Sequence, residues 1–286
     1  MPDLAGKVAV VTGATSGLGR WVAEGLASRG ATTVVVGRTQ ERTAAVASEI
    51  SRRTQNPEVH PEPVTDLALR AEVARLSSHL RERYPRIDLL VNNAGAYFHR
   101  RQVTPEGLER TFALNVLAPY VLTSRLGPLL LAHPPARVVM VASAAHRGHH
   151  VDFEDLQSAR DYRGFRVYGR SKLELILLAR EFARRLQDGH VSVNAVHPGF
   201  VATNFGRNNG GAVGFGLGLS SRLFGRNVRS AAEDLVFAST DPSLEGRTGE
   251  YLSHRTVRPG SPQSRDPAAA RRLFNACELL ARGVAD

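Results

Sequence analysis

The sequence predicts an α/β domain with a single doubly wound, parallel sheet of about seven strands and helices on both faces. Short β-branched runs, such as those at residues 7–12 and 137–143, alternate with longer amphipathic segments, which is the order expected of such a sheet. The 286 residues suffice for one large domain with a buried core. We find no internal repeat, so we expect residues 1–286 to form one domain with its core at about residues 7–252.

The composition is that of an ordinary soluble protein, with 42% apolar and 22% charged residues. Cys277 is the single cysteine, which excludes an internal disulfide and suits a reducing cytoplasm. No apolar run is long enough to cross a bilayer, and the N-terminus lacks the pattern of a signal peptide. We therefore expect a cytoplasmic protein without a transmembrane segment, so that any membrane contact would be peripheral.

The formal net charge of +10 raises the question of a nucleic acid or an anionic membrane as partner. The arginines are dispersed over helical patterns, however, as at Arg70, Arg75, Arg81 and Arg83, and they form no basic run. A solvated arginine-rich surface, helped by an anionic cofactor, explains the charge better. We expect no nucleic-acid partner.

The first strand, at residues 7–12, runs directly into a glycine-rich turn that opens a helix ending near Gly30, and a second strand follows at residues 32–36. Strand, glycine loop, helix and strand make up the dinucleotide-binding unit, whose glycines let the backbone approach a pyrophosphate at the helix N-terminus. The alternative is a plain turn with a helix-packing contact. The candidate cofactor-binding residues of this turn are Gly13, Thr15, Ser16, Gly17, Leu18 and Gly19.

Three motifs follow one another along the chain: T-G-x-x-x-G-x-G at residues 12–19, N-N-A-G at residues 92–95 and Y-x-x-x-K at residues 168–172. Together they resemble the short-chain dehydrogenase/reductase family, over about residues 7–252. The resemblance implies a Rossmann fold, a nicotinamide cofactor and oxidoreductase activity.

The second strand ends in Gly37 and Arg38. An acidic residue there would accept hydrogen bonds from the adenosine ribose, whereas glycine followed by arginine leaves room for a 2′-phosphate and supplies a guanidinium to hold it. We therefore expect NADP(H) as the cofactor, in preference to NAD(H). An exposed arginine at a strand end is the alternative.

The next elements are a helix at residues 41–54, a strand at residues 58–64 that two prolines weaken, and a helix ending near Tyr84. Between the last two stand Asp66 and Leu67, which by resemblance lie against the adenine ring of the cofactor. Asp66 also suits a helix N-cap, and it could serve in both ways.

A fourth strand, at residues 87–91, is closed by the N-N-A-G loop. The resemblance implies that this loop shapes the floor of the cofactor site and ties neighbouring strands together. We interpret it as mainly structural, with Asn93, Ala94 and Gly95 beside the cofactor.

Residues 104–131 form a long predicted helix that contains Asn115. Asparagine has a poor helix propensity and would otherwise be an ordinary polar residue. In the family an asparagine at this position perturbs the helix and positions a water that is linked to the active-site lysine. Many relatives dimerise through the helices that contain Asn115 and Tyr168, so the resemblance raises the question of a homodimer, and the sequence itself does not fix the oligomeric state.

The fifth strand ends in Ser143, at the edge where functional groups of open α/β sheets gather. Tyr168 and Lys172 lie one above the other on a helical pattern, so the ammonium should lower the phenol pKa below its ordinary value of ~10. Such a tyrosine exchanges a proton with a substrate oxygen near neutral pH. The resemblance makes Ser143 a hydrogen-bond donor to that oxygen and lets Lys172 also hold the nicotinamide ribose.

The stretch between Ser143 and Tyr168 is longer than in most relatives and resembles the retinol dehydrogenase and protochlorophyllide reductase branch. It contains His146, His149 and His150, which raise the question of a metal. No carboxylate or cysteine stands at ligand spacing, so we expect loop histidines and no metal site.

A sixth strand at residues 191–196 leads into the P-G-x-V-x-T element. By resemblance this element holds the nicotinamide carboxamide, with Pro198, Gly199, Val201 and Thr203 as candidates. Residues 204–226 combine glycines with apolar side chains and make a candidate substrate lid, with a low-complexity linker as the alternative. The remaining elements are a helix at residues 230–238, a last strand at 249–253, an exposed loop at 259–267 and a closing helix at 268–280.

These residues predict an NADP(H)-dependent oxidoreductase that interconverts a carbonyl and an alcohol, such as a ketoreductase, on a small molecule with an apolar portion. Tyr168 would act as general acid or base, with Asn115, Ser143 and Lys172 as the other catalytic residues. One alternative is the reduction of a carbon–carbon double bond, which protochlorophyllide reductase performs. Another is a non-catalytic NADP(H)-binding regulator, against which the complete set of four residues argues.

Overall fold

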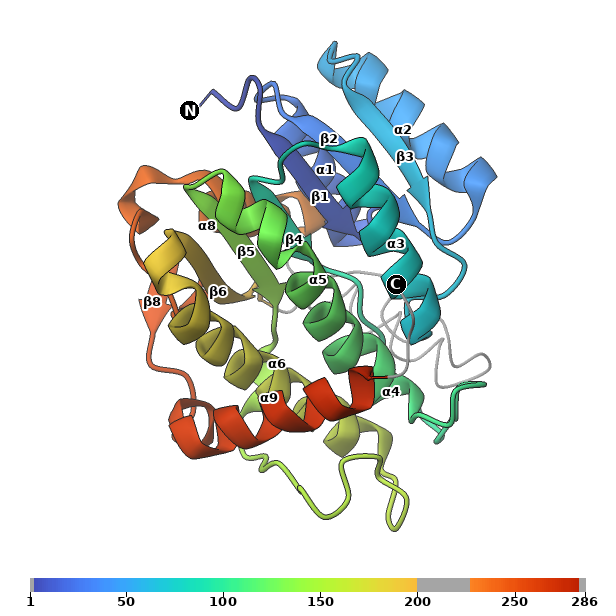
Figure 1. Cartoon of the computed structure of the whole chain (residues 1–286), viewed down its shortest axis with the longest axis vertical. Coiled ribbons are helices and arrows are strands. Elements are labelled where there is room, and N and C mark those ends of the chain that lie inside the picture. The colour runs from blue at the N-terminus through green and yellow to red at the C-terminus, as the bar shows by residue number, and fades with distance from the viewer. Residues whose placement is uncertain (1–2, 200–226, 283–286) are drawn as a thin grey trace.

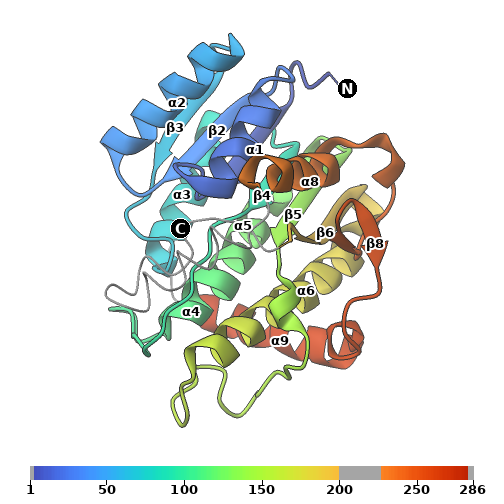
Figure 2. The same cartoon turned by 180° about the vertical axis from the view of Figure 1, so that it is seen from behind.

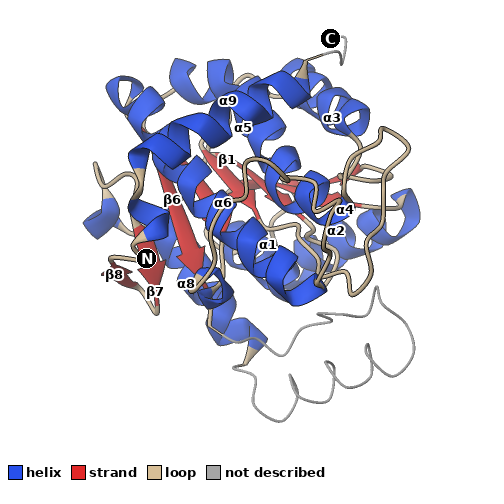
Figure 3. Ribbon diagram, turned by 90° about the horizontal axis from the view of Figure 1, so that it is seen from below, coloured by secondary structure: helices blue, strands red, loops and turns tan. Residues whose placement is uncertain are grey.

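The computed structural model describes residues 3–199 and 227–282 of the chain. The expected substrate lid at residues 204–226 and the candidate cofactor residues Val201 and Thr203 lie outside the described residues. The described part forms one α/β domain, as the sequence predicted, with a sheet between two layers of helices (Figure 3).

One sheet runs through the described chain. Its strands are β1 (Val8–Thr12), β2 (Thr32–Gly37), β3 (Val59–Pro63), β4 (Leu89–Asn92), β5 (Ala136–Val141), β6 (Val191–His197), β7 (Tyr251–Ser253) and β8 (Thr256–Arg258). Their order is β3-β2-β1-β4-β5-β6-β7-β8, and the chain reverses direction across the sheet between β1 and β4, which makes it doubly wound. The first seven strands in this order are parallel, which confirms the predicted parallel sheet of about seven strands, and β8 adds an antiparallel strand beside β7.

Helices cover both faces of the sheet (Figures 1 and 2). The longer ones are α1 (Gly17–Ala27), α2 (Gln40–Thr54), α3 (Arg70–Arg83), α5 (Ala118–Ala132), α6 (Gly164–Leu186), α8 (Val228–Thr240) and α9 (Pro267–Ala281). On one face, α1, α2 and α8 pack through side chains such as Leu26, Ile50 and Leu235. On the other, α3, α5 and α6 pack through a second cluster that includes Leu76 and Leu126.

The strand sequences explain their positions. Every residue of β1 is buried, as expected for a β-branched run in a parallel sheet covered on both faces. β3, which contains Pro61 and Pro63, stands at the edge of the sheet and pairs with β2. Proline lacks a backbone N–H, and it is tolerated there because an edge strand has no second neighbouring strand to which that N–H would donate.

The strand that the sequence did not predict belongs to a tight hairpin. His254 and Arg255, between β7 and β8, have φ angles of 52° and 59°. Two consecutive residues in this left-handed region make the type I′ geometry that joins twisted antiparallel strands. Because this turn is more often made by asparagine or glycine, its sequence carried no hairpin signal.

The predicted helix at residues 104–131 begins later than expected. Residues 104–109 are irregular, with a bridge between Val103 and Glu109. The Glu109 carboxylate then accepts hydrogen bonds from the backbone nitrogens of Thr111 (2.7 Å) and Phe112 (2.8 Å), which starts the short helix α4 (Arg110–Phe112). A π-helical turn, η1 (Ala113–Leu117), follows and leads into α5, so the helix around Asn115 is perturbed.

By length and composition, the segment Arg110–Ala132 could cross a membrane, with a mean hydropathy of 1.2. Of the most apolar window of this segment, 67% is buried inside the domain. Side chains such as Leu117, Leu122 and Leu126 belong to the core cluster shared with α3 and α6. The described chain therefore contains one such segment, and it behaves as a core helix.

The closing helix, α9, packs across α6 and α5 (Figure 1). The rings of Tyr120, Phe182 and Phe274 meet there, with Phe274 4.9 Å from Tyr120 and 5.0 Å from Phe182 between centroids. Aromatic rings at these distances and at steep angles attract one another beyond simple burial. The chain's own helix thus covers part of the α5–α6 surface at which the resemblance raised the question of a homodimer.

Candidate active site

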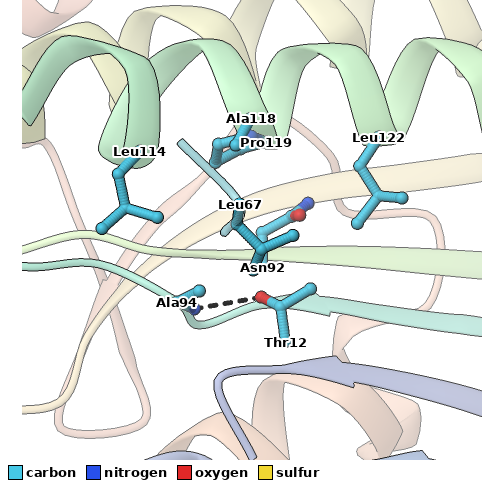
Figure 4. A pocket seen from close by; sticks show the side chains of 8 residues that line it. All are labelled: Thr12, Leu67, Asn92, Ala94, Leu114, Ala118, Pro119 and Leu122. Carbon is cyan, nitrogen blue, oxygen red and sulfur yellow. Dashed lines mark hydrogen bonds between the residues drawn. The ribbon is translucent and has the colours of Figure 1, made fainter. Parts of the chain in front are cut away.

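The loop after β4 joins two strands at their carboxyl ends. The Thr12 hydroxyl accepts hydrogen bonds from the backbone nitrogens of Asn93 and Ala94, both at 3.0 Å. Figure 4 shows the bond from Ala94. The Asn93 side chain returns a hydrogen bond from Nδ2 to the Thr12 carbonyl at 2.8 Å. This is the strand-tying role that the resemblance implied for the N-N-A-G loop.

The glycine turn between β1 and α1 is compact. Gly13 and Gly17 have φ angles of 65° and 54°, a region that favours glycine. A Cβ on Gly19 would lie 2.4 Å from Asn93 Nδ2 and 2.6 Å from the Gly13 carbonyl oxygen, so a side chain does not fit there. Leu18 packs against the core cluster below the turn.

The N-terminus of α1 is open to an anion. Ser16 occupies the N-cap position, yet its side chain makes no capping hydrogen bond within the described structure, and the first turn carries no acidic residue. Free backbone N–H groups at a helix N-terminus, with the positive end of the helix dipole, attract a phosphate. The turn and this helix end therefore fit a dinucleotide pyrophosphate.

The end of β2 lies beside the glycine turn. A Cβ on Gly37 would lie 2.2 Å from the Thr15 side chain, which keeps this strand end closely packed. Arg38 follows as an exposed residue, and it forms no ion pair within the described part of the chain. A guanidinium without an internal partner remains available for an anionic ligand.

Asp66 and Leu67 take up two different positions. Asp66 Oδ1 accepts from the Ala68 backbone nitrogen at 2.9 Å, and Oδ2 forms an ion pair with Arg110. The N-cap of α3 is Leu69, so the N-cap interpretation of Asp66 is wrong. Leu67 faces a small cavity beneath α5, between that helix and the strand ends (Figure 4). The cavity is lined by Thr12, Leu67, Asn92, Ala94, Leu114, Ala118, Pro119 and Leu122.

Asn115 joins the π-helical turn to two other segments. Its amide donates to the Ala96 carbonyl at 2.9 Å and accepts from the Ala96 nitrogen at 2.9 Å. The same Nδ2 donates to the Ser171 hydroxyl at 3.0 Å, which in turn donates to the Tyr168 carbonyl at 2.7 Å. The predicted helix perturbation thus places Asn115 against the helix that carries the tyrosine.

Ser143, Tyr168 and Lys172 come together at the carboxyl ends of β5 and β6. The Ser143 hydroxyl lies beside the Tyr168 phenol, near enough for a side-chain interaction that lowers the phenol pKa. The Lys172 ammonium lies 5.6 Å from the centre of the Tyr168 ring and donates to the Val141 carbonyl at 2.9 Å. A Cβ on Gly95 would lie 3.2 Å from Lys172 Nζ, so the N-N-A-G loop forms one wall of this site.

The electrostatics of this pair differ from the prediction. Burial raises the pKa of the Tyr168 phenol to about 12, with the Ser143 hydrogen bond as the opposing cause. Burial also lowers the pKa of Lys172 to about 8. The expected lowering of the tyrosine pKa is therefore wrong for the protein alone, because desolvation by burial dominates the pKa of both side chains.

Pro198 and Gly199 follow β6 at the same edge of the sheet. Gly199 has a φ angle of 85°, which a residue with a side chain rarely adopts. The other two candidates of this element, Val201 and Thr203, lie outside the described residues.

Two residues of this region were not predicted as part of the site. The Tyr97 ring lies edge-on to Tyr168, with 6.3 Å between centroids, and its hydroxyl bonds to His99 Nδ1 at 3.3 Å. His146 lies in the connection between β5 and α6, as expected of a loop histidine, but its side chain is fully buried. Tyr97 follows the N-N-A-G loop by two residues, a proximity that would have been the available signal.

The loop around Ser261 is a further correction. Residues 259–267 were expected to be exposed, but Ser261 and Ser264 are buried and a short 3₁₀ turn, η6 (Gln263–Arg265), occupies the segment. The same part of the chain also has no candidate metal site: within residues 3–199 and 227–282 there is no group of three or more histidine, cysteine, aspartate or glutamate side chains that could hold a metal ion.

The chain is similar in sequence to known proteins. The family described as short chain dehydrogenase matches residues 7–214. Retinol dehydrogenase 13 from Mus musculus is 34% identical over 274 residues, covering 94% of this chain and 82% of its own length. A Streptomyces protein named provisionally as a daunorubicin C-13 ketoreductase is 36% identical over 275 residues, covering 96% and 92%.

The fold is also similar to that of solved structures. The Pseudomonas aeruginosa RhlG/NADP active-site complex superposes with a TM-score of 0.68 at 29% identity, covering 88% of this chain and 95% of that one. The match to the family extends over more than half of this sequence, and the two relatives cover most of it. The chain therefore belongs to the short chain dehydrogenase family of oxidoreductases.

Proposed function

We propose that the protein is an NADP(H)-dependent oxidoreductase that interconverts a carbonyl and an alcohol on a substrate with an apolar portion. The observation that carries this proposal is the juxtaposition of the Ser143 and Tyr168 hydroxyl groups, with Lys172 beside them, at the carboxyl ends of the parallel strands. In doubly wound sheets, ligands bind at this edge. The pair brings together two hydroxyl groups that could hold one substrate oxygen.

The cofactor assignment is supported by the glycine turn and the end of β2. The uncapped N-terminus of α1 suits a pyrophosphate, and the buried Gly37 followed by the exposed Arg38 suits a 2′-phosphate. No acidic residue stands at the end of β2 to bind a free ribose hydroxyl. The solved complex of RhlG with NADP is consistent with this choice.

The chemistry follows from the two hydroxyl groups. When bound, NADPH would supply a hydride to the carbonyl carbon. Because the pKa of Tyr168 is about 12, its phenol is protonated at neutral pH and ready to give a proton to the carbonyl oxygen. Ser143 would donate a hydrogen bond to the same oxygen as its negative charge develops.

Lys172 and Asn115 are assigned supporting roles. With a pKa of about 8, the buried Lys172 ammonium is mostly charged at neutral pH and would stabilise the phenolate left after proton transfer. Its donation to the Val141 carbonyl keeps it beside Tyr168. Asn115, bonded to Ser171 and the Ala96 backbone, would order the segment through which a water could return the proton.

The substrate class is supported by the names of the relatives. Retinol dehydrogenase names an alcohol on a long apolar chain, and a C-13 ketoreductase names a ketone on a large ring system. Tyr97, lying edge-on to Tyr168, adds an aromatic wall to the site. We therefore assign a bulky ketone, aldehyde or alcohol as the substrate.

A substrate panel tests the proposal. Apolar ketones, aldehydes and alcohols would be offered with NADPH or NADP⁺, and turnover followed at the nicotinamide absorbance. We expect oxidation of NADPH with at least one bulky carbonyl compound and formation of the matching alcohol. A saturated ketone formed from an unsaturated one would instead indicate carbon–carbon double-bond reduction.

A further inference from the structure

The His146 ring is held at both nitrogens by backbone groups. Nδ1 lies 2.7 Å from the Ser143 carbonyl oxygen, and Nε2 lies 3.1 Å from the Ser261 backbone nitrogen. A carbonyl oxygen can only accept, and a backbone nitrogen can only donate. The proton therefore sits on Nδ1, and Nε2 accepts, so the ring is a neutral imidazole with one tautomer fixed by its neighbours.

The partner on the far side is a compact turn of the C-terminal segment. The Ser264 hydroxyl donates to the Ser261 carbonyl at 2.7 Å, and the Ser264 nitrogen donates to the Ser261 hydroxyl at 3.3 Å. Gly260, just before it, has a φ angle of 75°, and a Cβ there would lie 2.5 Å from the Ser264 hydroxyl. This turn leads directly into α9 and gives His146 a fixed point of attachment.

The near side bears on the proposed catalytic serine. The Ser143 carbonyl accepts from the backbone nitrogen of His146 at 3.2 Å as well as from its ring. The Ser143 hydroxyl accepts from the Ala145 nitrogen at 3.2 Å, where it caps the short 3₁₀ turn η2 (Ala144–His146). The turn that orients the hydroxyl is therefore the turn that His146 anchors.

Simple core packing does not account for this arrangement. The ring is fully buried and lies edge-on to Tyr251, with 5.0 Å between centroids, a place that an apolar side chain could fill. A buried imidazole without partners is costly, so its presence is favourable only because both nitrogens are bonded. The two bonds join the end of β5 to the C-terminal turn, and His146 and Ser261 are 115 residues apart in the sequence.

We propose that His146 is a positioning residue, which as the neutral Nδ1-protonated imidazole fixes the Ser143 turn against the Ser261 turn and so aims the serine hydroxyl at the substrate oxygen. This inference deepens the proposed function and rests on its assignment of Ser143. Because the ring is fully buried and bonded to the Ser143 carbonyl, it acts through the backbone of Ser143. The catalytic serine is thereby coupled to the segment that places α9.

Two variants separate the two hydrogen bonds. The amide nitrogen of asparagine stands about where Nδ1 stands, so His146→Asn can keep the bond to the Ser143 carbonyl. The amide of glutamine reaches about as far as Nε2, so His146→Gln can keep the bond to the Ser261 nitrogen and loses the other. His150→Ala, at an exposed histidine of the same loop, is the control.

The expected kinetic result is a fall in kcat without a matching change in KM or in NADPH affinity. Misplacing a catalytic group by a fraction of a bond length typically costs about tenfold to a hundredfold in rate. We expect that loss for His146→Gln, a smaller one for His146→Asn, and none for His150→Ala. Equal activity of glutamine and asparagine variants, or losses that track a fall in the unfolding midpoint and in NADPH affinity, would overturn the proposal.

The tautomer can be tested without any substrate. In ¹⁵N-histidine-labelled protein, the signals of His146 are assigned by their disappearance in His146→Asn. We expect a protonated Nδ1 and an unprotonated Nε2 near neutral pH, in contrast with exposed histidines. A protonated Nε2 contradicts the proposed linkage even if the enzyme is active, whereas the expected tautomer in a protein that turns over no substrate would place the failure in the proposed function.

Discussion

The proposed cofactor half of this site, around the glycine turn, and the proposed substrate half, around Ser143, are built from different kinds of contact. Around the glycine turn, the decisive feature is close backbone approach, as where Gly19 meets Asn93 and Gly13. Around Ser143, the decisive feature is hydrogen bonding between distant polar groups, as where His146 meets Ser261 or Tyr162 donates to the Phe98 carbonyl at 2.9 Å.

This difference explains why the glycine turn can be recognised from the sequence alone. Close backbone approach requires glycine, and glycines at fixed spacing make a motif. A hydrogen bond between a histidine and a backbone nitrogen requires no particular partner side chain. The hydrogen bonds that hold the Ser143 turn in place therefore depend on geometry that the residue types alone do not indicate.

The largest expected effect concerns the substrate half. Tyr168→Phe removes the proposed proton donor and keeps the ring that packs against Tyr97. We expect turnover to fall by at least about a hundredfold, the usual contribution of a general acid, with NADPH affinity retained. Steady-state kinetics on a confirmed substrate and a fluorescence titration with NADPH measure the two quantities. Near-normal turnover would show that another group gives the proton.

The second prediction concerns the cofactor half. Arg38→Ala removes the guanidinium proposed to hold the 2′-phosphate, so NADPH affinity should fall by about one to two orders of magnitude. Affinity for NADH, which lacks that phosphate, should hardly change, and neither should turnover at saturating NADPH. Binding titrations with both cofactors decide the matter, since equal losses would assign Arg38 another role.

Prediction from sequence is limited to features that depend on local composition or spacing. The β-branched strands, the glycine turn and the order of Ser143, Tyr168 and Lys172 were predicted because each depends on local composition or spacing. The late start of the helix after Glu109 was missed because a buried carboxylate cap looks like any glutamate. The β7–β8 hairpin was missed because His254 and Arg255 are unusual turn residues.

The pKa shifts of Tyr168 and Lys172 could not be predicted from the sequence, for a related reason. The four-residue spacing of Tyr168 and Lys172 predicts their proximity but not their burial. Both are almost completely buried, and desolvation dominates the pKa of each. Spacing along a helix gives neighbours, whereas a pKa also depends on everything packed around them.

The third prediction tests the close approach itself. Gly19→Ala places a Cβ 2.4 Å from Asn93 Nδ2, so the turn must shift, which we expect to cost about 1–3 kcal/mol of unfolding free energy and to weaken NADPH binding. Gly127→Ala in α5 is the matched control, because a Cβ there meets nothing within 4 Å. Alanine should be neutral or stabilising at that helical position by up to about 1 kcal/mol.

Denaturant unfolding of both variants, with and without NADPH, gives the comparison. If the Gly19 and Gly127 variants behave alike, close approach does not explain the glycine at position 19.

The smallest expected effect concerns Glu174, buried in α6 with Arg170 3.5 Å away. Burial raises its pKa from 4.5 to about 8. The folded protein therefore holds this proton more tightly than the unfolded chain, so the group's contribution to stability is complete below about pH 4.5 and is lost as pH rises through about pH 8. Glu174→Gln should gain stability relative to wild type by a few degrees in unfolding midpoint between about pH 5 and about pH 9.

Glu181, on the same helix, provides the opposite control. Ion pairs with Arg184 and Arg185 lower its pKa, so its contribution is present at neutral pH and lost as pH falls through the folded pKa. Glu181→Gln should therefore lose stability relative to wild type as pH rises from acid to neutral. A difference between Glu174→Gln and wild type that stays constant with pH would contradict the burial argument.

The central claim, hydride transfer to a carbonyl carbon at the Ser143–Tyr168 pair, is tested most directly by following the hydride. NADPH carrying deuterium at the transferable position of the nicotinamide would be incubated with the enzyme and a bulky apolar ketone, and the product analysed by mass spectrometry and NMR. We predict deuterium on the carbinol carbon of the alcohol, and at least about a hundredfold less of this product in a parallel reaction with Tyr168→Phe over the same time. Deuterium on a carbon beside an intact carbonyl, or an undiminished yield of labelled alcohol from Tyr168→Phe, would contradict the account.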